Sequence, residues 1–79
     1  MKTPRNLSGK ELASVLVRKW SYIIVHQTGS HIILVTEQPS HHRISIPAHK
    51  PVRVGTLEDI LKDVASHKGV SKEDILRSL

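Results

Sequence analysis

The stretch YIIVHQTGSHIILVT, residues 22–36, decides the fold. Two runs rich in β-branched residues flank the short turn TGS, and this pattern is typical of an antiparallel β-hairpin. Gly29 suits such a turn because a glycine accepts a positive φ without a Cβ clash. We therefore expect one strand over residues 22–28 and a second over residues 31–36.

The second of these strands begins with a titratable residue, His31, and is otherwise aliphatic. Side chains alternate between the two faces of a strand, so His31 shares a face with Ile33 and Val35, and the opposite face carries Ile32 and Leu34. A small sheet with helices on one side requires only one apolar face. Either a partner covers the second apolar face, or loops shield it.

The chain around the hairpin predicts a third strand and a first helix. RISIP, residues 43–47, alternates isoleucine with polar residues, as a strand with one buried face does. Leu7–Lys19 has helical periodicity, with Ser8 at the N-cap and Glu11 three residues later, which is the spacing of a capping box. Its apolar stripe ends at Trp20, which we interpret as a core anchor rather than a platform for base stacking.

Two further helices complete the expected fold. Thr56 is placed to cap the first of them, with Asp59 at N3, and Gly69 is placed to end it. Ser71 is placed to cap a short last helix, KEDILRSL. The order of one helix, three strands and two helices predicts an α+β domain, in which the helices pack on one face of a three-stranded antiparallel sheet.

Length and charge limit the possible functions. The 79 residues predict a single domain, in which residues 1–6 form a flexible N-terminus. The net charge is +5, and residues 1–56 hold eight Lys and Arg against two acidic residues, so this part of the chain would attract polyanions such as nucleic acid.

No apolar run approaches the roughly 20 residues of a membrane span, and the start of the chain lacks the apolar core of a signal peptide. We expect a cytoplasmic protein that makes no membrane contact.

Cysteine is absent, which excludes disulfides and a cysteine nucleophile. Histidine is frequent, with six residues, but no spacing typical of a metal site accompanies them, so we expect neither a metal nor another cofactor. His26, His41 and His42 are interpreted as surface residues.

RNA cleavage needs few protein groups, because the ribose 2′-hydroxyl itself is the nucleophile. A base takes its proton, cations stabilise the phosphoryl oxygens, and an acid protonates the leaving oxygen. Histidine, with an ordinary pKa near 6.5, suits the base or the acid role. His31, Arg43, Lys50 and Arg53 are of the required types. The same types also fit a non-catalytic RNA-binding domain, or a structural domain with solvated charges and a histidine bonded to a carbonyl at a strand end.

Three motifs in sequence resemble the HicA toxins: TGSHIIL at 28–34, ISIPAHK at 44–50 and VGTLEDIL at 54–61. The resemblance covers roughly residues 8–79. It implies a fold like that of a double-stranded-RNA-binding domain, and the toxin of a type II toxin–antitoxin system. It also implies a metal-independent endoribonuclease that cleaves mRNA as single-stranded RNA, with one catalytic histidine at the G-S-H position, which is His31.

The resemblance further implies a HicB-type antitoxin that covers the active surface, which would account for the second apolar face. Without that partner we expect a monomer or a weak dimer. The acid that protonates the leaving group stays open between His31 itself, a water molecule and His49. The residues that we expect to contact RNA are Gly29, Ser30, Arg43, His49, Lys50 and Arg53.

Overall fold

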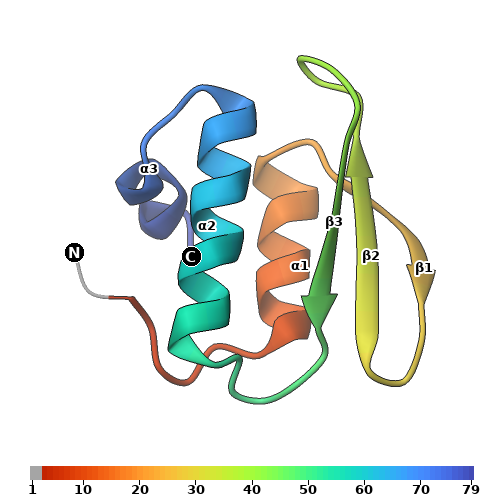
Figure 1. Cartoon of the computed structure of the whole chain (residues 1–79), viewed down its shortest axis with the longest axis vertical. Coiled ribbons are helices and arrows are strands. Elements are labelled where there is room, and N and C mark those ends of the chain that lie inside the picture. Colours follow the sequence, from red (N-terminus) through yellow and green to blue (C-terminus); the bar gives the residue numbers. More distant parts are fainter. Residues whose placement is uncertain (1–2) are drawn as a thin grey trace.

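The computed structural model describes residues 3–79. Its elements are α1 (Gly9–Lys19), β1 (Ile23–Gln27), β2 (His31–Thr36), β3 (His42–Pro47), α2 (Val54–Lys68) and α3 (Lys72–Arg77). This order and the α+β class confirm the prediction from sequence. In Figure 1 the helices α1 and α2 lie on one side of the sheet, and α3 lies on the far side of α2 from the strands.

The three strands form one antiparallel sheet in the order β1-β2-β3. Its inner face carries Ile32 and Leu34 of β2, which pair with Ile46 and Ile44 of β3. All four side chains are buried in a core shared with the helices. The alternation read from the sequence therefore assigns the two faces of β2 correctly.

The outer face of the sheet is open among residues 3–79 (Figure 1). Ile33 and Val35 are only half-buried there, and Ile23, which pairs with Val35, is 61% exposed. The whole of β1 is exposed, and its register shifts between Ile24 and His26. The second apolar face expected from the sequence is thus present, and no loop of the described residues shields it.

Two of the helix starts follow the predicted caps. The Ser8 side chain accepts a hydrogen bond of 3.1 Å from the N–H of Glu11 at the start of α1. Ser71 and Asp74 form a complete capping box at the start of α3. Gly69 ends α2 with φ 70, in the left-handed region that favours glycine, which confirms its predicted position.

The predicted start of α2 is wrong. The helix begins at Val54, after Arg53 in an extended conformation, and no side chain caps it, so Thr56 lies inside the first turn. Contacts of Val52 with distant parts of the chain explain why the helix begins earlier than predicted. Val52 is buried, and its N–H donates to the Leu7 carbonyl at 2.8 Å, which fixes where the chain enters the helix.

The flexibility of residues 1–6 stays a prediction: residues 1 and 2 lie outside the described residues, and the Thr3 hydroxyl donates to the Glu58 carboxylate. Within residues 3–79 no helix combines the length and the apolar character that crossing a bilayer requires.

Candidate active site

Thr28 holds the turn between β1 and β2. Its N–H donates to the His31 carbonyl at 2.9 Å, and its hydroxyl accepts from the N–H of His31 at 3.0 Å and of Ser30 at 3.4 Å. Such side-chain-to-backbone bonds are typical of threonine in turns. They fix the backbone of Ser30 and His31 while both side chains remain exposed. We had not predicted this role of Thr28, although a threonine just before Gly-Ser was its signal.

Gly29 lies at the tip of this turn, but the predicted reason for a glycine is wrong. Gly69 is the glycine with positive φ among residues 3–79, and Gly29 does not share that conformation. A Cβ built on Gly29 would meet no atom within 4 Å. Neither backbone strain nor packing therefore requires glycine here, and the position exposes bare backbone two residues before His31.

His31 is the first residue of β2 and lies on the open face of the sheet. Its imidazole is exposed, and Nδ1 lies 3.1 Å from the Ser30 hydroxyl oxygen. Within the described residues the ring makes no hydrogen bond to a carbonyl, so the interpretation as a carbonyl-bonded histidine finds no support. The ring is held next to a hydroxyl and is open to a molecule that binds the outer face of the sheet.

The segment after β3 runs beside this turn. The N–H of Ala48 donates to the Ser30 carbonyl at 2.9 Å. His49 and Lys50 follow directly and are both exposed. The fold thus brings the segment with two of the predicted RNA contacts against the turn that holds His31.

Gly9, at the start of α1, fixes the other side of the same segment. Its N–H donates to the His49 carbonyl at 3.0 Å. A Cβ on Gly9 would overlap the Pro47 carbonyl oxygen and lie 3.0 Å from the Ala48 Cα. Sequence reasoning missed this residue, and its one signal was a poor helix former directly after the capping serine.

One of the two predicted arginines, Arg43, lies further away. Arg43 pairs with Val35, four positions along β2 from His31, which is about 13 Å at the usual rise of a strand. It shares the open face with His31, but at the other end. Arg53 is exposed at the N-terminus of α2. The structure therefore groups Ser30, His31 and the segment 48–50, and does not place Arg43 beside them.

A second histidine group occupies the opposite end of the sheet. His42, expected at the surface, is half-buried, with Nδ1 2.8 Å from the Tyr22 hydroxyl and Nε2 3.3 Å from an Asp63 oxygen. The ring of His67 stacks on it with centroids 4.3 Å apart. Burial, with a smaller contribution from the charge of Asp63, raises the pKa of Tyr22 to about 12. These contacts tie β3 to α2 and leave the imidazole of His42 with two protein partners.

The other two histidines expected at the surface, His26 and His41, are exposed. Among residues 3–79 no three His, Asp or Glu side chains gather in a way that could hold a metal ion.

A family model described as HicA toxin of bacterial toxin–antitoxin matches residues 9–65. This span contains α1, the whole sheet and most of α2, and therefore the turn with His31 and the segment 48–50. No curated protein and no solved structure matches the chain.

Proposed function

The chain belongs to the HicA family of toxins from bacterial toxin–antitoxin systems, and we propose that it acts as a metal-independent endoribonuclease on mRNA with His31 as its catalytic group. The observation that carries the proposal is the exposed imidazole of His31 on the open face, on a backbone that Thr28 fixes. A reactive group must be both accessible and held in place, and His31 satisfies both conditions.

In the proposed reaction His31 takes the proton of a ribose 2′-hydroxyl. The freed 2′-oxygen bonds to the adjacent phosphorus, and the bond from phosphorus to the 5′-oxygen breaks. The 5′-oxygen takes up a proton, so the products carry a 2′,3′-cyclic phosphate and a 5′-hydroxyl. The proton donor is His31 after the first transfer, His49 or a water molecule. Because the substrate supplies the nucleophile, the protein needs no nucleophilic side chain of its own.

The neighbours of His31 support the positioning of a phosphate. The Ser30 hydroxyl lies 3.1 Å from the His31 ring, and the bare backbone of Gly29 allows a close approach. Lys50 and Arg53, both exposed, provide positive charge on the chain that follows β3. In this role their replacement weakens binding to all RNA sequences alike and reduces its salt dependence.

The activity is tested with purified protein and a long single-stranded RNA in the presence of EDTA. We expect fragments to appear. Intact RNA together with a salt-dependent shift in a native gel would overturn the proposal in favour of a non-catalytic RNA-binding domain.

Gly29→Val separates the role of the turn in catalysis from its role in folding. The side chain enters open space, so the midpoint of thermal unfolding should stay within a few degrees of wild type. The same side chain would hold the RNA backbone away from His31, and we expect kcat/KM for RNA cleavage to fall about tenfold or more. Wild-type kinetics in the folded variant would show that RNA does not approach the turn.

A toxin of this class has an antitoxin partner, and we assign that partner to the open face of the sheet. Ile23 is 61% exposed on this face and pairs with the half-buried Val35, and burying such side chains favours association. A protein seated there would also cover His31. Hydrogen exchange of the antitoxin complex should show slower exchange of the β1 amides than in the free toxin. Unchanged exchange in β1, in a complex that no longer cleaves RNA, would place the antitoxin elsewhere.

A further inference from the structure

A hollow of about 360 Å³ opens where α1 and α2 end beside the connection between β2 and β3. Its lining residues are Lys19, Trp20, Ser21, Gln38, Pro39 and Lys68. His31 begins β2 and the hollow lies beyond the other end of that strand, so about 17 Å separate the two at the usual rise per residue. The hollow is therefore distinct from the candidate active site.

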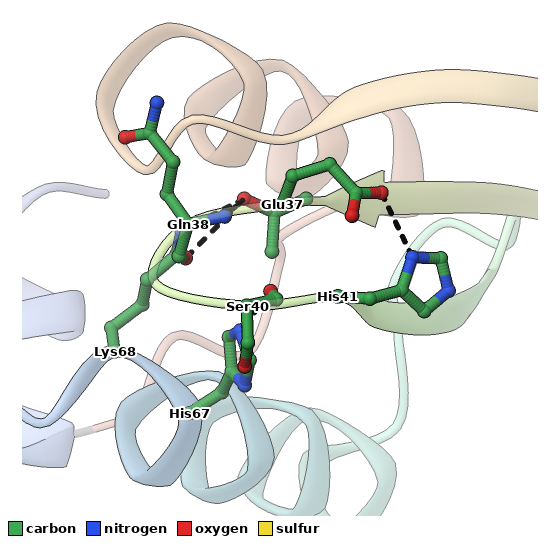
Figure 2. Close-up of polar contacts among 7 residues, drawn as sticks. Glu37, Gln38, Ser40, His41, His67 and Lys68 are labelled. Carbon is green, nitrogen blue, oxygen red and sulfur yellow. Dashed lines mark hydrogen bonds and ion pairs between the residues drawn. The ribbon is translucent and has the colours of Figure 1, made fainter.

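The ammonium group of Lys68 is the most constrained charge at this hollow. It donates to the Gln38 carbonyl at 2.6 Å (Figure 2) and to the Thr36 hydroxyl at 3.0 Å. It also lies 4.9 Å from the centroid of the Tyr22 ring. An ammonium has three donors, so one remains after these two bonds. Burial lowers the pKa of Lys68, and no carboxylate of the described residues pairs with it. A half-buried cation without a carboxylate favours an anionic ligand.

The acidic residue next to Gln38 in the chain, Glu37, does not neutralise this charge. Glu37 directs its carboxylate to His41, with 2.8 Å between Oε2 and Nδ1, and Figure 2 shows this pair on the other side of the connection from Lys68. Lys19 adds a second cation, whose ammonium donates to the Ser78 carbonyl at 3.3 Å. The lining contains two lysines and no acidic side chain.

An aromatic ring and a free amide complete the hollow. Trp20 is half-buried against the core, as expected of an anchor, and its indole N–H donates to the Ser78 hydroxyl at 2.9 Å. Its remaining surface lines the hollow, so the residue that anchors the core is also open to contact with a base, which the interpretation from sequence set aside. The Gln38 side chain makes no hydrogen bond within residues 3–79 and extends away from Lys68 in Figure 2. A ring can stack on a base, and an amide can bond to the edge of a base.

We propose that this hollow is a nucleotide subsite for the RNA strand, in which Lys19 and Lys68 bind a phosphate and Trp20 stacks on a base. The choice of RNA as the source of the nucleotide rests on the proposed function. The combination of two cations, an aromatic ring and no acid distinguishes a nucleotide from a metal ion or a basic peptide. The subsite would hold the strand several nucleotides from the bond that His31 cleaves.

The test uses the fluorescence of Trp20, the single tryptophan of the chain. Adenosine 5′-monophosphate, adenosine and inorganic phosphate are titrated separately into the full-length protein. We expect saturable quenching by the monophosphate, and binding at least about tenfold weaker for adenosine and for Lys68→Gln, because a charge-assisted hydrogen bond is lost in both. Lys62→Gln, an exposed lysine of the same helix, is the matched control and should bind like wild type.

Lys68 also bonds to the connection between β2 and β3, so Lys68→Gln removes a structural contact together with the proposed ligand contact. Two more variants separate these two effects. Lys68→Arg retains the charge and should restore most of the binding. Lys19→Gln removes the exposed cation and should weaken binding with an unchanged midpoint of thermal unfolding. Three results would each overturn the nucleotide subsite. The first is the absence of quenching in wild type, and the second is an equal loss of affinity for the monophosphate in Lys62→Gln and Lys68→Gln. The third is binding of inorganic phosphate as tight as that of the monophosphate.

This binding test does not depend on cleavage. If the monophosphate binds as described and RNA stays intact, the subsite stands and the proposed ribonuclease falls. If RNA is cleaved, Lys68→Gln should raise KM for a long RNA about tenfold and leave kcat and the cleavage of a dinucleotide unchanged. An equal effect of this variant on the dinucleotide would contradict a remote subsite.

Discussion

Replacement of His31 by alanine should lower the rate of RNA cleavage by about 10²–10⁴-fold, which is the usual contribution of a general acid or base. The fold should survive, because the side chain is exposed and its one side-chain hydrogen bond within residues 3–79 is to the Ser30 hydroxyl. We therefore expect a thermal unfolding midpoint within a few degrees of wild type. Single-turnover cleavage of a labelled RNA measures the loss directly.

His41→Ala is the matched control for this measurement. His41 is also exposed and also has one side-chain partner, Glu37 at 2.8 Å, but it lies at the opposite end of the sheet. Full activity is expected of it. If both variants cleave RNA at the wild-type rate, His31 is not the catalytic group. If the two lose activity equally, the effect of His31→Ala is not specific to the site.

Gly9→Ala should give the largest loss of stability from a single methyl group. The added carbon would overlap the Pro47 carbonyl oxygen, which is backbone and cannot rotate away. Relief requires α1 to move from the segment 48–50, at the expense of the bond from the Gly9 N–H to the His49 carbonyl. Overpacking of this kind costs about 1–3 kcal/mol, so we expect the free energy of unfolding in urea to fall by that amount.

Gly55→Ala provides the comparison for Gly9→Ala. Gly55 lies in the first turn of α2, and a Cβ there meets nothing within 4 Å. Alanine is the better helix former, so stability should stay the same or rise by up to about 1 kcal/mol. Equal effects of the two substitutions would mean that α1 does not approach the end of β3 as closely as the structure shows.

The elements that follow from local patterns were predictable from the sequence. The hairpin prediction rests on two β-branched runs around a short turn, and the antiparallel pairing of β1 and β2 confirms it. The assignment of faces in β2 rests on the alternation of side chains, and burial of Ile32 and Leu34 confirms it. The caps Ser8 and Ser71 rest on bonds between residues three positions apart. Such signals involve residues a few positions apart, so they can be read from the sequence without knowledge of the tertiary contacts.

Features that depend on distant segments were not predictable. The start of α2 is set by the contact of Val52 with Leu7, and this contact overrides the local signal of Thr56. Gly9 is required by a backbone segment about 40 positions later. His42 is half-buried because Asp63 and His67 approach it from α2. The residues next to them in the sequence carry no pattern that predicts these distant partners.

The candidate site contains features that the sequence predicted and features that it did not. His31 was located by the resemblance to the HicA toxins, and its exposure on the open face follows from the alternation of β2. The separation of Arg43 from His31 followed only once the register of β2 and β3 was known. Gly29 was singled out for a positive φ that it does not have, and its open surroundings suggest access for the substrate instead.

The central claim is that His31 activates the ribose 2′-hydroxyl without a metal, and the ends of the RNA products test it most directly. RNA cleaved by wild-type protein in EDTA should carry a 2′,3′-cyclic phosphate at one new end and a 5′-hydroxyl at the other. These ends can be identified by mass spectrometry of the fragments. New ends with a 5′-phosphate would contradict the account, because they require water rather than the 2′-hydroxyl as the nucleophile.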